Sequence, residues 1–222
     1  LKKRAEKEPW ILNNSPEKKK YKFIICIPSY AELNHLPLTL KSIAQQNKKL
    51  LDKTLVIVVI NNGPNPYPKV LTNNEHTKKL VLSNSQNFEV IPVDAYSKGL
   101  ELPEKFAGVG LARKIGFDLA LPYSDDSTIF CNLDADSLIS DHYLIKVKEY
   151  FDNPDKSAGV TNFSHQTPVL KENAESIQIY EKFIRNTSLK LTECASPYYY
   201  HAIGSTIVCR TDAYAAVSGM PR

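Results

Sequence analysis

The sequence of 222 residues lacks the features of a membrane-spanning protein and of a repeat protein. No apolar run approaches the roughly 18 residues that a membrane span needs, and neither an internal repeat nor a low-complexity tract is present. No signal peptide is visible. Because the chain starts at Leu1 and not at Met, further sequence before Leu1 is an open alternative. The whole sequence has 42% hydrophobic and 23% charged residues, which is the composition of a globular domain.

Cysteine is scarce, and no two cysteines have Cys-x-x-Cys spacing. The four are Cys26, Cys131, Cys194 and Cys209, and at least three of them lie in apolar, strand-like runs. This pattern favours reduced, buried thiols. Reduced thiols are typical of a cytoplasmic protein, which is the localisation that we predict.

Positive charge is also limited outside the amino terminus. The formal net charge of +4 comes largely from basic residues before position 21, including the run Lys18-Lys19-Lys20. A nucleic-acid binder would carry a basic stripe on its folded body, so no nucleic-acid partner is expected. Residues 1–20 are predicted to be a basic tail or a solvated helix, and a peripheral contact with the inner face of a membrane stays open.

Strand-like and helix-like segments alternate across the first 150 residues. Short apolar runs that end in turns predict buried strands at 23–28, 55–60, 88–93 and 128–133. Apolar spacing typical of helices occurs at 36–46 and 109–122. The alternation predicts an α/β fold, with a mostly parallel sheet flanked by helices on both faces.

The second part of the chain has a different pattern. We expect a strand near 158–161, a packing helix at about 171–191, a tyrosine-rich loop at 198–200 and a strand at 205–210. The prediction is therefore one domain, residues 21–222, made of a first half at 21–140 and a second half at 141–222.

Polar segments directly follow three of the predicted strands, at 28–32, 61–64 and 134–136. In a parallel α/β sheet, ligands bind outside the carboxyl ends of the strands. These segments are therefore expected to converge on one crevice.

The segment at 134–136 ends an apolar run with two carboxylates, Asp134-Ala135-Asp136. In an extended chain these two side chains point to the same face, with Ala135 on the other. Two neighbouring carboxylates repel each other unless a cation lies beside them, and oxygen ligands suit Mg²⁺ or Mn²⁺ carrying a diphosphate. The alternative is a strand-end turn in which Asp134 caps a local hydrogen bond, and the Asp-x-Asp pattern alone favours that alternative.

Four motifs, taken in order, resemble those of glycosyltransferases with the GT-A fold, specifically the large inverting family 2. Singly each is weak; the ordered set, which spans Phe23 to Gly219, is strong. Ile27-Pro28-Ser29-Tyr30-Ala31-Glu32 resembles the family's I-P-x-Y-N-E, and Val58-Val59-Ile60-Asn61-Asn62-Gly63-Pro64 resembles V-V-D-D-G-S. Gly110-Leu111-Ala112-Arg113-Lys114-Ile115-Gly116 resembles G-x-A-R-N-x-G, and Ile203-Gly204-Ser205 through Gly219 resembles the segment before the catalytic acid.

The resemblance implies a nucleotide-binding half at 21–140 and an acceptor-side half at 141–222. The donor would be a nucleotide diphosphate sugar, with a UDP-sugar favoured, and the acceptor a hydroxyl of a carbohydrate, a lipid or another molecule. Asp134 and Asp136 would hold Mn²⁺ or Mg²⁺, and His201 and Gly204 would face the sugar or the acceptor. The implied nucleotide-binding residues are Pro28, Tyr30, Glu32, Asn61, Arg113 and Asp134.

Each of these side chains also has a plainer interpretation. Tyr30 can be an interfacial tyrosine, Arg113 a solvated helix arginine and His201 a packed loop histidine. The chain departs from the family where Ala31 and Lys114 replace asparagine and where Asn61 replaces the base-contacting aspartate. Asparagine can both donate and accept a hydrogen bond, so the departure leaves the nucleobase open.

No catalytic residue is assigned. An inverting transferase needs a base that deprotonates the acceptor hydroxyl, and the resemblance places it a few residues beyond the turn at Gly219. We therefore expect the base beyond Arg222 and the acceptor-side half to be incomplete. Two further hypotheses stay open: a non-catalytic domain that binds nucleotide sugars, and a sugar nucleotidyltransferase, whose Gly-rich, Lys-containing loop the segment 28–31 does not resemble.

Overall fold

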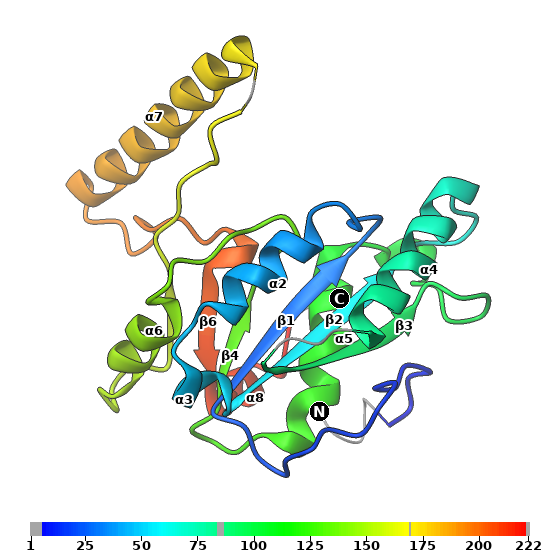
Figure 1. Ribbon diagram of the computed structural model, residues 1–222. Helices are drawn as coiled ribbons and strands as arrows, with labels where there is room; N and C mark the ends of the chain where they lie inside the picture. The colour runs from blue at the N-terminus through cyan, green and yellow to red at the C-terminus, as the bar shows by residue number, and fades with distance from the viewer. Residues whose placement is uncertain (1–5, 84–86, 169, 221–222) are drawn as a thin grey trace.

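A computed structural model describes residues 6–83, 87–168 and 170–220, and within them a six-stranded sheet (Figure 1). The strands run in the order β3-β2-β1-β4-β6-β5. The first four pair in parallel, and β6 pairs antiparallel with both β4 and β5. The bounds are β1 (Phe23–Ser29), β2 (Thr54–Asn61), β3 (Glu89–Ala95), β4 (Ile129–Asn132), β5 (Ala158–Val160) and β6 (Ile207–Arg210).

Helices cover both faces of this sheet (Figure 1). One face packs against α2 (Leu36–Ala44), α3 (Lys48–Leu51), α4 (Pro68–Leu82) and α6 (Tyr143–Phe151). The other packs against α5 (Val109–Ala120) and α8 (Thr211–Ala216). Short 3-10 turns occur at Glu104–Phe106, Leu121–Tyr123 and Gly204–Thr206. The predicted α/β class, mostly parallel with helices on both faces, is confirmed.

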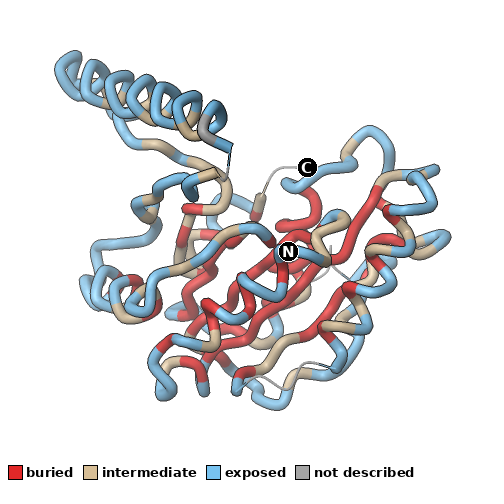
Figure 2. The backbone as a smooth tube through the Cα atoms, turned by 45° about the horizontal axis from the view of Figure 1, so that its top comes forward, coloured by how far each residue is buried: buried red, intermediate tan, exposed pale blue. Residues whose placement is uncertain are grey.

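The two faces of β1 supply the two halves of the hydrophobic core. Phe23, Ile25 and Ile27 pack on the α2 side, whereas Ile24 and Cys26 pack on the α5 side. Successive side chains in a strand alternate between faces, so a strand between two helical layers is apolar at every position. Figure 2 shows the consequence: buried residues concentrate in the central strands.

Gly116 allows α5 to lie close to the sheet. A Cβ atom at this position would overlap Cys26 Sγ on β1 and would lie 3.1 Å from Val59 Cγ2 on β2. Because β1 and β2 are fully buried strands, neither neighbour can move outward. The glycine therefore sets the distance between α5 and the sheet.

Replacing Gly116 with alanine is expected to lower the free energy of unfolding by about 1–3 kcal/mol, the usual cost of overpacking a core. Gly110→Ala is the matched control in the same helix, since a Cβ there meets no atom within 4 Å. That change should leave stability equal or raise it by about 0.5–1 kcal/mol. Urea unfolding of both variants measures this, and equal stabilities would contradict the packing role of Gly116.

The amino-terminal segment is not a solvated tail over its whole length. Trp10 is only 5% exposed and donates from Nε1 to the Leu100 carbonyl at 2.7 Å. Leu12 forms an antiparallel bridge with Val93 of β3, and the Asn13 amide donates to Pro92. The segment covers the free edge of β3, which would otherwise expose unpaired backbone groups.

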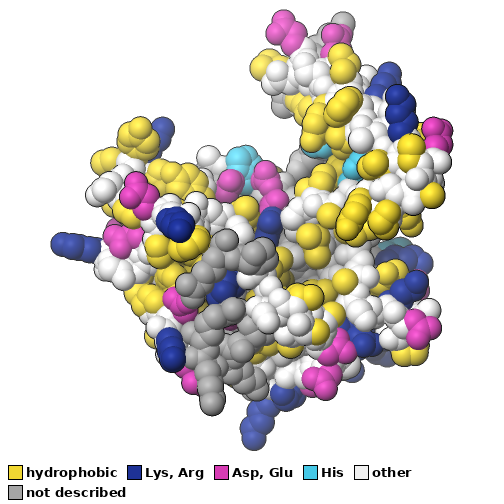
Figure 3. Space-filling view, turned by 180° about the vertical axis from the view of Figure 1, so that it is seen from behind, with side chains coloured by type: hydrophobic (Ala, Val, Ile, Leu, Met, Phe, Trp, Pro, Cys, Tyr) yellow, Lys and Arg dark blue, Asp and Glu magenta, His cyan; other side chains and the backbone are white. Residues whose placement is uncertain are grey.

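The helix α7 (Lys171–Glu193) agrees with the predicted bounds but not with the predicted packing. None of its described side chains is buried; Phe183, for example, is 67% exposed. Figure 3 shows α7 standing clear of the body, with hydrophobic side chains on its surface. Among the residues that the structure describes, no helix is long and apolar enough to cross a membrane.

All four cysteines are free thiols, and three are at least partly shielded by the fold. Burial raises the pKa of Cys26, Cys131 and Cys209 to about 12. Cys194, at the end of α7, is exposed.

Because only the thiolate reacts with alkylating reagents, we expect one fast-reacting thiol in the native protein at neutral pH. That thiol is Cys194, and the other three should react after unfolding. Mass spectrometry after a short maleimide pulse measures this, with Cys194→Ser as the control that removes the fast reaction. Fast labelling of Cys26 in the native protein would contradict the burial of β1.

Candidate functional site

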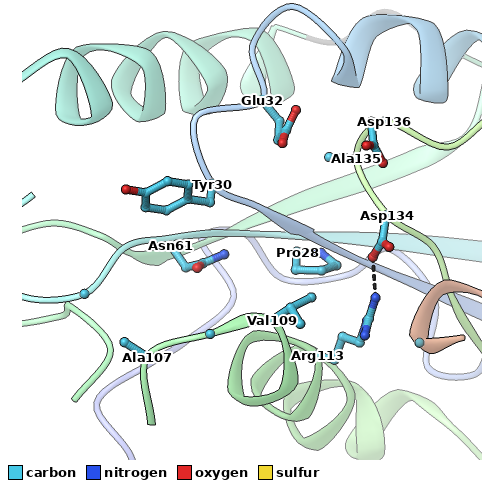
Figure 4. Close-up of a pocket in the computed structure, with 13 residues that line it drawn as sticks. Pro28, Tyr30, Glu32, Asn61, Ala107, Val109, Arg113, Asp134, Ala135 and Asp136 are labelled. Carbon is cyan, nitrogen blue, oxygen red and sulfur yellow. Dashed lines mark hydrogen bonds and ion pairs between the residues drawn. The ribbon is translucent and has the colours of Figure 1, made fainter. Parts of the chain in front are cut away.

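A cavity of about 740 Å³ opens at the carboxyl ends of β1, β2 and β4 (Figure 4). It lies where the strand order reverses, with β2 on one side of β1 and β4 on the other. Eight of the nine predicted site residues line it: Pro28, Tyr30, Glu32, Asn61, Arg113, Asp134, Asp136 and Gly204. The crevice expected from the strand ends is therefore present.

The loop after β1 brings two side chains to the cavity. Its turn is made by Ala31, whose φ of 56° lies in the left-handed region that non-glycine residues seldom adopt. Tyr30 before it is 52% exposed and presents its ring at the cavity. Glu32 after it lies 2.7 Å from Nδ1 of His35 through Oε2.

Asn61 at the end of β2 is buried and holds two strand ends together. Its Nδ2 donates to the carbonyl oxygens of Ser29, at 3.2 Å, and Val59, at 3.0 Å. Both amide hydrogens are therefore engaged by backbone, and a ligand in the cavity would meet the side-chain oxygen, Oδ1.

Asp134 and Asp136 come from the turn that follows β4. The strand itself stops at Asn132, so the two carboxylates do not belong to a continuing strand. Both nevertheless line the same cavity, and Ala135 between them is buried. Side-chain oxygens are the ligands that Mg²⁺ and Mn²⁺ prefer.

Arg113 on α5 pairs with one of these carboxylates. Its Nη2 donates to Asp134 Oδ1, shown as the dashed line in Figure 4. The side chain is only about 8% exposed, and its Nε has no hydrogen-bond partner among the described residues. The predicted alternative, a solvated helix arginine, is therefore wrong, because the guanidinium is buried at the cavity wall.

Gly204 provides the space for that guanidinium. A Cβ atom at position 204 would overlap Nη1 of Arg113. Gly204 thus lines the cavity with its backbone, and the Arg113 guanidinium packs against that backbone.

The charges around the cavity do not balance. Among the described residues that line it, Glu32, Asp134 and Asp136 supply three carboxylates, and Arg113 supplies the one cationic side chain. The guanidinium is already paired with Asp134. An anionic ligand would be repelled here unless it brought a cation with it.

The described residues contain no cluster of three or more His, Cys, Asp or Glu side chains that could hold a metal. Asp134 and Asp136 would therefore be the protein ligands of a cation, and its other positions would go to water or to the bound molecule. This fits Mg²⁺ and Mn²⁺, which are commonly bound by one or two carboxylates together with phosphate oxygens.

His201 is the predicted site residue that lies outside this cavity. Its ring centroid is 6.3 Å from that of Phe163, in an edge-on arrangement. The Nε2 atom is buried and lacks a hydrogen-bond partner among the described residues. The packed-loop interpretation describes this position better than contact with the other site residues.

A second cavity, of about 750 Å³, lies on the other side of Asp134 and Asp136 and shares both carboxylates. Its walls come from the 133–140 segment and from the second half of the chain, which contributes Phe163, His165 and Arg185. The His165 ring stands edge-on to Phe163 and to Tyr180 of α7.

Four further residues line the first cavity and were not expected there: Gly63, Ala107, Gly108 and Val109. A Cβ at Gly63 would lie 3.1 Å from Ala107 Cβ, so the two loops meet closely there. The Asn62-Gly63 turn in the sequence was the available indication. The contribution of the 107–109 segment depends on its tertiary placement, which the sequence does not show.

Comparison with known proteins identifies the family. Residues 24–216 match the family model for glycosyl transferase family 2. This chain belongs to that family. None of the curated proteins compared with this family 2 chain matches it.

Three solved structures are similar to the family 2 chain. Mannosyltransferase PcManGT from Pyrobaculum calidifontis, in complex with GDP-Man and Mn²⁺, has 17% identity and a TM-score of 0.50, over 99% of this chain and 53% of that one. S. aureus TarS has 17% identity and a TM-score of 0.49, over 89% and 49%. TarS in complex with UDP-GlcNAc has 16% identity and a TM-score of 0.47, over 89% and 47%.

The chain thus spans about half the length of these solved structures. At such identity the likeness to PcManGT shows the fold alone. That fold is of the GT-A type, as the motif resemblance implied.

Replacing Gly204 with alanine is expected to displace Arg113 from Asp134 while changing the free energy of unfolding by less than about 1 kcal/mol. The added Cβ meets only the far end of a flexible side chain, which can move aside. Gly108→Ala is the matched control in the same cavity, since a Cβ there meets nothing within 4 Å. Crystal structures of both variants measure the Arg113 position, and an intact Arg113–Asp134 pair in Gly204→Ala would contradict the expected crowding.

Proposed function

We propose that this family 2 chain binds a nucleotide diphosphate sugar together with Mn²⁺ or Mg²⁺ and transfers the sugar to an acceptor hydroxyl with inversion. The observation that carries the proposal is the charge imbalance of the 740 Å³ cavity, with three carboxylates against one paired guanidinium. A diphosphate enters such a site only with a divalent cation. The favoured donor is UDP-linked, and the chain acts as a glycosyltransferase or as its donor-binding portion.

The residues around the cavity fit the parts of such a donor. Pro28 and the Tyr30 ring offer apolar surface for the base, and Glu32 can accept hydrogen bonds from ribose hydroxyls. Arg113 lines the cavity, where its guanidinium can donate to phosphate oxygens. Asp134 and Asp136 would hold the metal. When bound, the metal supplies Lewis-acid stabilisation of the charge that builds up on the leaving diphosphate.

The ligands of one similar structure are of the proposed kind, although the likeness to it shows only the fold. PcManGT was solved in complex with GDP-Man and Mn²⁺. Its donor carries guanosine, so the neighbour supports a metal-bound nucleotide sugar without selecting uridine. Asn61, which stands in place of the family's aspartate and lines the cavity, is the residue that we expect to contact the base.

The second cavity is the proposed acceptor site. It shares Asp134 and Asp136 with the donor cavity, so a hydroxyl bound there would lie close to the bound sugar. Its histidine, glutamine and serine side chains can hydrogen-bond hydroxyl groups, and Phe163 offers an aromatic surface. No described residue is assigned the role of the general base.

Calorimetric titration with UDP, GDP and CDP, each with and without Mn²⁺, tests the proposal. We expect one nucleotide, UDP, to bind, and to do so at least tenfold more weakly without Mn²⁺. The double variant Asp134→Asn, Asp136→Asn should lose the metal-dependent part of the binding, because its neutral amides are poor ligands for a hard cation.

The control for this variant is Asp126→Asn, Asp141→Asn, which makes the same change in net charge at two exposed positions outside the cavity. It should bind as the wild type does. If binding is independent of metal, or if both double variants lose it equally, Asp134 and Asp136 do not form the site.

A further inference from the structure

Two loops carry most of the polar side chains of the donor cavity, and each is held from behind by buried polar side chains of one helix. The loop at 30–33 after β1 is held by α4. The turn at 134–139 after β4 is held by α2. The side chains that hold these loops do not line the cavity.

Asn74 of α4 is the centre of the first anchor. It is completely buried, and its Oδ1 accepts from the Ala31 amide at 3.0 Å. Its Nδ2 donates to the Asn61 carbonyl at 3.2 Å and to Asn62 Oδ1 at 3.1 Å. One side chain thus ties the loop after β1 to the end of β2.

The neighbouring residue adds a weaker second contact, because Asn73 Oδ1 accepts from the Leu33 amide at 3.1 Å. The loop needs this external support, since Ala31 has a left-handed φ of 56° that alanine does not favour by itself. Tyr30 and Glu32 flank Ala31, so the orientation of both depends on how Ala31 is held.

Thr39 of α2 is the corresponding anchor on the other side of the cavity. It is also completely buried, and its Oγ1 donates to the Ala135 carbonyl at 2.7 Å, between the two carboxylates. Ser42, one turn further along α2, accepts from the Ile139 amide at 3.2 Å. Residues three apart share a helix face, so both bonds come from one polar stripe directed at the turn.

These bonds differ from the apolar contacts that make up most of the core. Buried helix positions facing a sheet are normally apolar, because a buried polar group is costly unless it is hydrogen-bonded. Here the polar groups are satisfied by loop backbone next to Tyr30, Glu32, Asp134 and Asp136. The two sets of bonds also share no residue, so each loop is held independently.

We propose that Asn74 and Thr39 are positioning residues for two separate halves of the site. Asn74 sets the Tyr30–Glu32 loop that receives the nucleoside, and Thr39 sets the Asp134–Asp136 turn that receives the metal and the diphosphate. The assignment of the two ligands rests on the proposed function, whereas the anchoring itself does not.

The first test measures hydrogen exchange in the protein without ligand. Asn74→Leu should speed exchange of the Ala31 amide about three- to tenfold, the factor that corresponds to one typical hydrogen bond. Thr39→Val, which replaces the hydroxyl with a methyl group, should do the same for amides in the 135–139 turn. Each variant should leave the other loop unchanged, and Thr39→Ser should restore the wild-type rates.

Thr77→Val is the control within α4. Thr77 is as buried as Asn74, but its hydroxyl donates to the Asn73 carbonyl at 2.9 Å and to Asn73 Oδ1 at 3.4 Å, both in the same helix. It should leave exchange of the Ala31 amide and of the 135–139 turn unchanged. If Asn74→Leu does not fold, the partly buried Asn73→Ala takes its place, with the Leu33 amide as the reporter.

The second test measures ligand affinity. Asn74→Leu should weaken UDP binding at saturating Mn²⁺ about three- to tenfold while leaving the Mn²⁺ requirement unchanged. Thr39→Val should raise the Mn²⁺ concentration needed for half-maximal UDP binding by a similar factor. A merely structural role would lower the unfolding midpoint and move neither quantity selectively.

The outcomes separate this inference from the proposed function. If the wild type binds none of UDP, GDP and CDP, the proposed function fails, and the exchange rates alone decide the anchoring. If either variant raises exchange equally in both loops, or raises it in neither, the two-anchor inference is overturned. This holds whether or not a nucleotide binds. If exchange changes only in the expected loop, but both variants lose the same UDP affinity and the same Mn²⁺ affinity, the assignment of the nucleoside to one loop and of the metal to the other is overturned.

Discussion

The parallel register of three central strands is the constraint on which the site depends. Pro28 of β1 lies opposite Val59 of β2, and Cys26 of β1 lies opposite Asn132 of β4. Parallel strands in this register end at the same edge of the sheet, so the segments that follow them must share one space. Residues more than a hundred positions apart in the sequence thereby line one cavity.

Electrostatics then determines what that cavity can hold. The carboxylates outnumber the cationic groups, and Arg113 is kept beside Asp134 by the absence of a side chain at Gly204. Without a bound cation, Arg113 is the partner of Asp134. A metal carried by a diphosphate would bring positive charge to the carboxylates and phosphate oxygens to the guanidinium, so that each charged group gains a partner.

Much of the fold could be predicted from the sequence, because strands buried on both faces are apolar at every position and the motifs follow their ends. Eight of the nine residues that we expected at the site line the first cavity. Apolar periodicity could not reveal α4, since Asn74 and Thr77 face inward and polar residues are assumed to face solvent. Nor could it show that Trp10 packs on the sheet or that α7 stands apart from it, because both depend on tertiary contacts.

The central claim is that Asp134 and Asp136 bind a divalent cation together with a nucleotide diphosphate. Its most direct test is the anomalous diffraction of Mn²⁺ in a crystal of the chain grown with UDP and MnCl₂. We expect one strong manganese peak in the first cavity, within coordination distance of oxygens of Asp134, of Asp136 and of both phosphates. UDP bound in that cavity without a manganese peak, or a peak away from both carboxylates, would contradict it.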